Sequence, residues 1–127
     1  MIVAVIGSSR ERDRVLAAYE AVRAHPRMSL ALDWIACMDA EKPDADLTHQ
    51  DRQSYAIADL NAIDDCDVVW LLASSEMSDS RTEFGYALGT GKPVVASGHL
   101  TLFAALADAE YRADAEAFAW LDGRAES

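Results

Sequence analysis

The apolar run Val68–Ala73 follows Asp67, precedes a polar segment, and contains no polar residue. A strand with apolar side chains on both faces is typical of a parallel sheet that is covered on both sides. The β-branched run Ile2–Ile6, which ends at Gly7, has the same character. Neither run approaches the roughly 20 apolar residues of a membrane span. The two runs therefore predict a buried sheet in a chain of 127 residues, about the size of one domain.

Helical periodicity alternates with strand-like runs along the chain. We expect strands at residues 2–6, 29–36, 67–72 and 94–96, and helices at about 11–24, 49–64, 82–90 and 113–121. Residues 100–107 are expected to form a short helix or turn, and Tyr111-Arg112 a brief edge strand. Apolar residues three or four positions apart mark the inward side of the first three helices: Val15, Tyr19 and Val22; Ala56, Leu60 and Ile63; Phe84 and Leu88. The alternation predicts an α/β fold, a three-layer sandwich around a mostly parallel sheet of four or five strands, with one domain over residues 1–127.

Composition narrows the range of partners. Eleven Lys and Arg against 22 Asp and Glu give a net charge of −11. Such a charge argues against binding to the backbone of a nucleic acid polymer or to an anionic membrane, although a local site can still hold one small anion. The N-terminus lacks the charged start and cleavage site of a signal peptide, so we expect a cytoplasmic protein with Cys37 and Cys66 as reduced, buried thiols. Neither the cysteines nor His25, His49 and His99 have metal-ligand spacing, and the sequence predicts no metal and no cofactor.

Ligands of parallel α/β sheets bind beyond the carboxyl ends of the strands. In this chain that edge comprises residues 7–10, 36–48 and 73–83. The connection at residues 37–48 is long, polar and acidic, so that it could shape a pocket. The other two segments contain groups that suggest chemistry.

The turn Gly7-Ser8-Ser9-Arg10 combines a flexible glycine, the start of a helix, two hydroxyls and a guanidinium. Free backbone N–H groups at a helix start, together with these donors, suit a phosphate. The alternative is a capping box between Ser8 and Glu11, with no ligand.

Glu83 begins the predicted helix 82–90, just past the end of a strand. A partly desolvated carboxylate at that place can attack an electrophilic carbon or transfer a proton. The helix N-terminus is expected to keep Glu83 ionised, which favours the role of nucleophile. Gly85 and Gly89, one turn apart, allow a close approach to the helix. The alternative is again a capping box, between Ser80 and Glu83.

Four further charged residues lie near these segments. Asp59 is at the border of the apolar stripe of the helix 49–64, where it either points over the end of the sheet or faces solvent. Asp79 and Arg81 flank Glu83 and either hold substrate hydroxyls or a leaving base, or are solvated loop residues. Asp67 begins a strand at the opposite edge of the sheet and is interpreted as a turn residue.

The segment Glu83–Val94, Glu-Phe-Gly-Tyr-Ala-Leu-Gly-Thr-Gly-Lys-Pro-Val, resembles the nucleoside 2-deoxyribosyltransferase family, which includes the 2′-deoxynucleoside 5′-monophosphate N-glycosidases. Members carry a Glu-x-Gly-x-Ala helix that ends near a Lys and follows an Asp-Val-Val strand, matched here by Asp67-Val68-Val69. The pair Asp59-Leu60 and the turn Gly7-Ser8 also resemble the family, and the similarity covers most of residues 2–97.

The resemblance implies a flavodoxin-like, Rossmann-like fold and cleavage or transfer at the N-glycosidic bond of 2′-deoxynucleosides or their 5′-monophosphates. Glu83 would attack C1′ of the deoxyribose and form a covalent deoxyribosyl-enzyme, and Asp59 would assist the departure of the base. The partner would be a small nucleoside or nucleotide, and the protein a homo-oligomer. The expected substrate-binding residues are Gly7, Ser8, Ser9, Arg10, Asp79 and Arg81.

Two departures from the family pattern support a different reading. The strand 2–6 has no Tyr, and residues 79–82 contain no Gly. The alternative function is therefore a non-catalytic module that binds or senses a nucleotide. A phosphoacceptor receiver domain, which shares the fold class, needs acidic residues where Gly7-Ser8 and Ala73-Ser74 stand, and the sequence argues against it.

Overall fold

The computed structural model describes residues 1–39 and 46–126. Five strands form one sheet in the order β2-β1-β3-β4-β5, and each neighbouring pair is parallel. This is the strand order of flavodoxin-like folds, which confirms the predicted α/β class. The strands are β1 (Ile2–Ile6), β2 (Ser29–Leu30), β3 (Val68–Ala73), β4 (Val94–Gly98) and β5 (Ala109–Tyr111).

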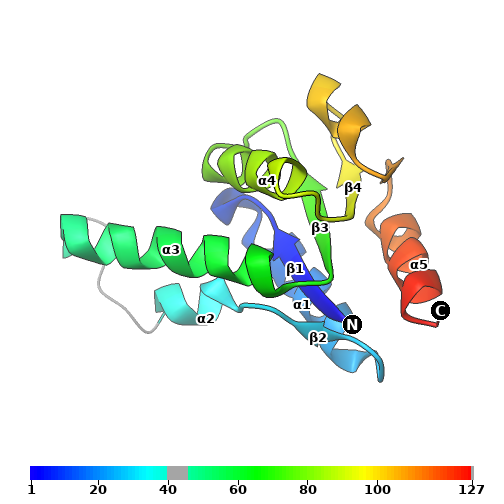
Figure 1. The fold of residues 1–127 in the computed structure, drawn as a ribbon, viewed down its shortest axis with the longest axis horizontal. Coiled ribbons are helices and arrows are strands. Elements are labelled where there is room, and N and C mark those ends of the chain that lie inside the picture. The colour runs from blue at the N-terminus through cyan, green and yellow to red at the C-terminus, as the bar shows by residue number, and fades with distance from the viewer. Residues whose placement is uncertain (40–45, 127) are drawn as a thin grey trace.

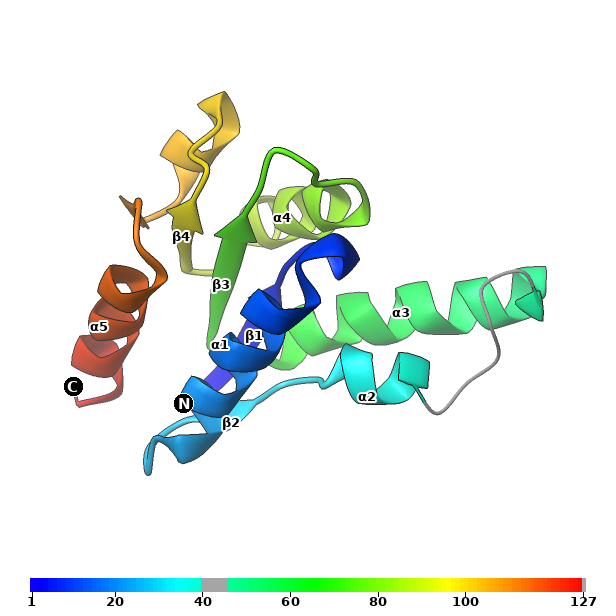
Figure 2. The ribbon, with the colours of Figure 1, turned by 180° about the vertical axis from the view of Figure 1, so that it is seen from behind.

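Helices cover both faces of this sheet (Figures 1 and 2). One apolar core lies between the sheet and helices α1 and α5, and the other lies between the sheet and helices α3 and α4. The helices are α1 (Arg12–Ala24), α2 (Trp34–Asp39), α3 (His49–Asp65), α4 (Asp79–Gly89) and α5 (Asp114–Ala125), with the 3-10 turns η1 (Ser9–Glu11) and η3 (Leu102–Leu106).

The continuous apolar runs are explained by this double cover. Successive side chains of a strand point to opposite faces. In β3, Val68, Trp70 and Leu72 enter one core, while Val69 and Leu71 enter the other. Because both faces of β3 are buried, a polar residue at any of these positions would lose its hydration.

The second predicted strand is much shorter than expected. Only Ser29 and Leu30 pair with β1, and the chain turns into α2 at Trp34. The reason is Asp33, whose Oδ1 accepts the backbone N–H of Ala36 at 2.8 Å, as an N-cap residue does. Part of the predicted connection 37–48 therefore belongs to α2, and its residues 40–45 lie outside the described residues.

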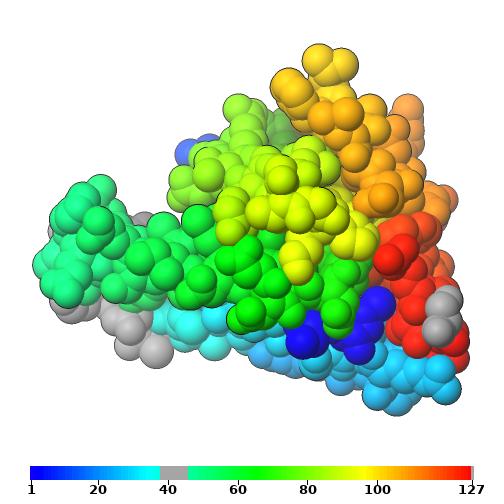
Figure 3. All heavy atoms as spheres, viewed as in Figure 1, coloured from blue at the N-terminus to red at the C-terminus, as the bar shows by residue number. Residues whose placement is uncertain are grey.

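Helix α3 forms where it was predicted, but its first half extends beyond the body of the molecule (Figures 1 and 3). Thr48 and Asp51 form a capping box at its start. Ile63, in the last turn, is buried, whereas Leu60 is only half-buried. Ala56 is exposed, so its assignment to the inward stripe is wrong: the helix has already left the sheet at that position.

Helix α4 begins at Asp79, three residues before the predicted start, and it ends as predicted, before Gly91 with its positive φ of 75°. Because Ser80 lies inside the helix and the N-cap is Ser78, the predicted alternative of a Ser80–Glu83 capping box is wrong. Both cysteines are free, but only Cys66 is buried, and the expectation of a buried Cys37 is also wrong. Among the described residues, no helix has the length and apolarity needed to cross a bilayer.

Candidate active site

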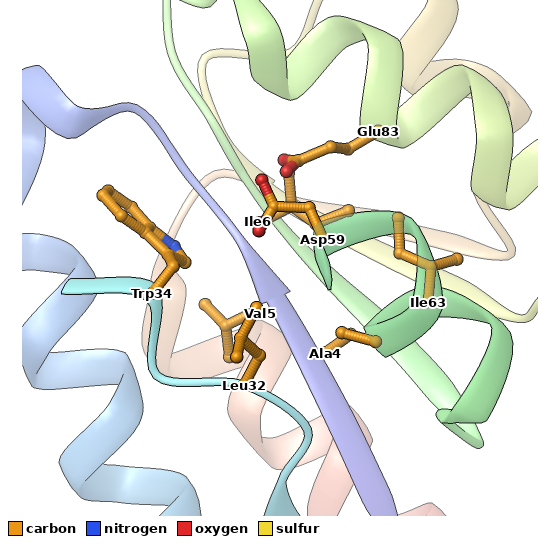
Figure 4. A pocket seen from close by; sticks show the side chains of 9 residues that line it. Ala4, Val5, Ile6, Leu32, Trp34, Asp59, Ile63 and Glu83 are labelled. Carbon is orange, nitrogen blue, oxygen red and sulfur yellow. The ribbon is translucent and has the colours of Figure 1, made fainter. Parts of the chain in front are cut away.

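A hollow opens beside the carboxyl end of β1, at the edge of the sheet where ligands of such folds bind. Its empty space is about 280 Å³ when the open solvent at its mouth is included, so the hollow is a shallow depression rather than a closed cavity. Glu83 from α4 and Asp59 from α3 line it together, and their carboxyl groups point toward one another (Figure 4). The structure thus brings together the two residues, 24 positions apart in sequence, that the sequence analysis selected as catalytic.

The two carboxyl groups share a hydrogen bond. Ionising both of them at once would cost free energy, because two like charges would then lie side by side in a partly buried place. Burial raises the pKa of Glu83 to about 8, and the charges of Asp59 and Asp79 add to the effect. Burial also raises the pKa of Asp59, again with a contribution from the charge of Asp79. The expectation that the helix N-terminus keeps Glu83 ionised is therefore wrong for the free protein: α4 begins four residues earlier, at Asp79, and desolvation and the neighbouring carboxylates raise the pKa of Glu83.

A pair of this kind holds one proton near neutral pH and carries one negative charge. The proton can reside on either carboxyl group, since it lies in the hydrogen bond that joins them. One state has an ionised Glu83 next to a protonated Asp59. That state offers a nucleophile and a proton donor side by side, which is the combination that glycosidic cleavage requires.

The remaining wall of the hollow is apolar or aromatic in the part of the chain that the structure describes. It is formed by Ala4, Val5, Ile6, Leu32, Trp34, Ala62 and Ile63. Trp34 is the residue that the sequence analysis missed. The signal for it existed, because Trp34 follows a strand toward the carboxyl edge, but the strand was predicted to continue to residue 36 and to include it.

The turn after β1 is placed as predicted, at the carboxyl edge of the sheet. Gly7 is required by packing, because a Cβ there would lie 2.8 Å from the Cγ2 methyl of Val15. Ser8 is buried and its Oγ accepts the backbone N–H of Arg10 at 3.2 Å, which caps η1. Ser9 and Arg10 are exposed and are not among the residues that line the hollow.

Asp79 and Arg81 occupy the first turn of α4, and both are exposed. Asp79 is close enough to raise the pKa of both Asp59 and Glu83, so it belongs to the electrostatic surroundings of the pair. Neither Asp79 nor Arg81 lines the hollow. Asp67 lies at the opposite edge, where its Oδ2 accepts the backbone N–H of Ile2 at 2.7 Å, in keeping with its predicted structural role.

Arg14 holds the strand ends at this edge, a role that no local pattern in the sequence indicates. Its Nη1 donates to the carbonyl of Ala73 and its Nη2 to the carbonyl of Ser97, both at 2.9 Å. Asp114 at the start of α5 accepts from Arg14 Nε and Nη2 at 2.8 and 2.7 Å. The guanidinium therefore holds the carboxyl ends of β3 and β4 to α5.

The spacing of the histidines in the sequence predicted no metal site, yet the structure brings His25 close to two acidic residues. The ligand atoms of His25, Asp122 and Glu126 lie within 4.8 Å of one another. They already have partners, since His25 Nε2 is 2.6 Å from Asp122 Oδ1 and Arg27 is 3.4 Å from Glu126. This cluster lies where α1 and α5 end, at the edge of the sheet opposite to the hollow.

The structure of the CMP N-glycosidase BcmB of Clostridium botulinum is similar to that of this chain, with a TM-score of 0.63. The similarity covers 96% of this chain and 98% of that one, at 14% sequence identity. At this identity the likeness shows the fold, and the fold is the one that the sequence predicts. The sequence matches no family model and no curated protein.

Proposed function

We propose that this chain cleaves the N-glycosidic bond of a nucleoside or nucleotide and passes the sugar to water or to a second base. It would do so as a member of the nucleoside 2-deoxyribosyltransferase family, with Glu83 as the nucleophile. The observation that carries the proposal is the hydrogen-bonded pair of Asp59 and Glu83 in a hollow at the carboxyl edge of the sheet. Two independent facts support it: the sequence around Glu83 resembles that family, and a similar fold belongs to an N-glycosidase of CMP.

The first step forms a bond between a Glu83 carboxylate oxygen and C1′ of the sugar, while the bond from C1′ to the base nitrogen breaks. Asp59, protonated at that moment, gives its proton to the departing base. The shared proton of the free pair moves to Asp59 before attack, so that no additional proton is needed. The carboxyl groups of retaining glycosidases are about 5–5.5 Å apart, so the sugar must first part this pair.

The second step resolves the ester on Glu83. A water molecule attacks C1′, the bond to Glu83 breaks, and Asp59 takes the proton of the water, which restores both groups. If a second base attacks instead of water, the same step yields a new nucleoside, and the enzyme is a transferase. Both outcomes use the same two residues.

A phosphate on the substrate would bind at the turn after β1. We propose Gly7, Ser8, Ser9 and Arg10 as this subsite, since consecutive residues at the start of η1 supply backbone N–H groups, two hydroxyls and a guanidinium. Replacement Arg10→Ala should weaken binding of a 5′-monophosphate and leave nucleoside binding unchanged. Equal affinities of the variant and the wild type for the monophosphate would contradict this subsite.

Residues Asp79 and Arg81 are proposed to contact the sugar hydroxyls or the leaving base from the first turn of α4. Both are exposed, so a substrate can reach them without a change of fold. Replacement Arg81→Ala should raise KM for every substrate by a similar factor, measured by release of base. An unchanged KM would remove Arg81 from the site.

The decisive experiment incubates the protein with ribo- and deoxyribonucleosides and their 5′-monophosphates and measures released base by chromatography. We expect release from at least one substrate, and a loss of at least about 1,000-fold for Glu83→Gln, whose amide is a poor nucleophile. The matched control is Glu76→Gln, an exposed acid in the loop before α4. Tight binding of a nucleotide that stays intact would instead identify a sensing module, and equal release by Glu83→Gln would exclude Glu83 as the nucleophile.

We also propose that the protein is a homo-oligomer, as the resemblance implies. The apolar side chains of Leu102, Phe103 and Leu106 on η3 are 84%, 65% and 62% exposed and would be covered in such an assembly. Light scattering after size-exclusion chromatography measures the mass directly. A monomer at micromolar concentration would contradict the proposal.

A further inference from the structure

We infer that Trp34 is the stacking platform for the nucleobase, and that the site accepts different bases because it binds them by their flat faces. This inference rests on the proposed function and adds the means by which the substrate is recognised. It concerns a residue in the hollow to which the preceding steps assign no part.

The first ground is the position of the indole. Trp34 faces the same hollow as Asp59 and Glu83, and Figure 4 shows it across the end of β1 from the two carboxyl groups. The base of a nucleoside is attached to C1′, the carbon that Glu83 attacks. The hollow is bounded by the carboxyl pair and by Trp34, so a base that extends along it from a C1′ at the pair would meet the indole.

The second ground is the chemistry of the wall. Among the described residues that line the hollow, three have a polar side-chain group: Asp59, Glu83 and Trp34, the last through its indole N–H. A wall of this kind cannot read the donors and acceptors along the edge of a base. An aromatic ring can still bind the face of any base, because every base has a π-face. Stacking on Trp34 therefore predicts binding that varies little among the four common bases.

The third ground is the way in which Trp34 is held. Asp33, the preceding residue, caps α2 through the backbone N–H of Ala36 and also pairs with Arg23 on α1. The Arg23 guanidinium lies 5.8 Å from the centre of the Tyr19 ring, and Tyr19 is fully buried against the backbone of Trp34. Tyr19 and Arg23, one turn apart on α1, thus support the turn at Asp33 and Trp34. A supported ring loses little freedom when it binds a base.

The test is a fluorescence titration of the Glu83→Gln protein, which binds without turning over. The ligands are deoxyadenosine, deoxyguanosine, deoxycytidine, thymidine, their 5′-monophosphates and CMP, with 2-deoxyribose 5-phosphate as the ligand that has no base. Stacking of a base on an indole quenches its fluorescence. The chain has three tryptophans, of which Trp70 is buried and Trp120 lies on α5 against Arg124. Trp120→Phe is therefore the matched control for Trp34→Phe.

We expect quenching by ligands that carry a base in the Glu83→Gln protein and in its Trp120→Phe variant. In the Trp34→Phe variant the quenching should be lost. Trp34→Ala should weaken binding of these ligands by roughly 5- to 150-fold, the effect of about 1–3 kcal/mol per stacked base. Binding of the base-free sugar phosphate should be unchanged. Circular dichroism verifies folding, and Trp34→Phe, which keeps a ring, should retain most of the affinity.

Two results would overturn the platform: quenching that persists in Trp34→Phe, or base-carrying ligands that bind Trp34→Ala as tightly as the parent. Differences of more than about 100-fold among the four bases would overturn the claim that the faces of the bases are what is bound. Failure of the proposed function looks different, because the wild-type protein would then release no base although Trp34 is still quenched. Absence of any response to all of these ligands would overturn both.

Discussion

The raised pKa of Glu83 makes the protein less stable at high pH, and Glu83→Gln should reverse that loss. A carboxyl group whose pKa is higher in the folded state than in the unfolded state favours folding when it is protonated. Its contribution is fully present below the unfolded pKa and is lost as the pH rises through the folded pKa. For Glu83 this interval runs from 4.5 to about 8.

The size of the effect follows from the same interval. A difference of about 3.5 between 4.5 and about 8 corresponds to about 5 kcal/mol when the group is fully ionised. Glu83 is only half-buried, so solvent screens part of this interaction. We therefore expect Glu83→Gln to be more stable than the wild type by about 2–4 kcal/mol at pH 9, and by less than about 1 kcal/mol at pH 5. Glutamine has nearly the same shape and keeps a donor for Asp59, but it cannot ionise.

Urea unfolding, monitored by far-UV circular dichroism, measures the free energy of unfolding directly at each pH. The experiment compares the wild type, Glu83→Gln and Glu76→Gln between about pH 5 and pH 9. Glu76 is an exposed glutamate seven residues earlier, so its replacement removes the same formal charge without the buried site. The two variants should therefore diverge above pH 7.

A raised pKa of Glu83 is refuted if the stability of Glu83→Gln follows that of the wild type at every pH. It is also refuted if Glu76→Gln gives the same increase, because net charge alone would then be the cause. A stabilised Glu83→Gln protein that no longer releases base would be the expected pattern for a strained active site, in which function is kept at a cost in stability.

Three further predictions concern neighbouring residues. Asp59→Asn should lower the pKa of Glu83, because it removes the nearest negative charge; carbon NMR of labelled glutamate would detect this, and an unchanged midpoint would contradict the pairing. Arg14→Met should cost about 2–4 kcal/mol in urea unfolding, since it removes the ion pair with Asp114 and one donor to each of two strand-end carbonyls, and a cost below about 0.5 kcal/mol would contradict this role. Gly7→Ala should cost about 1–3 kcal/mol, because the added methyl would lie 2.8 Å from a buried valine methyl; an unchanged midpoint of unfolding would show that the turn can relax.

The places where sequence-based expectation succeeded have a common physical cause. A strand such as β3, buried on both faces, must be apolar at every position, and this requirement is visible in the sequence. Prediction from the sequence failed at residues 29–36, where loose alternation of polar and apolar residues predicted a strand. There the chain leaves the sheet after Leu30, and Asp33 caps α2 while its carboxylate also pairs with Arg23 from another helix.

The candidate site divides in the same way. The order of residues along the chain is enough to place Glu83 after a buried strand and to show that the residues around it resemble a deoxyribosyltransferase. Folding brings Asp59 to Glu83, raises the pKa of both carboxyl groups, and places Trp34 at the same hollow. These properties depend on burial and on distances between side chains from separate helices. Such quantities do not exist until the chain has folded, and here they reverse the charge state that the helix N-terminus alone would predict.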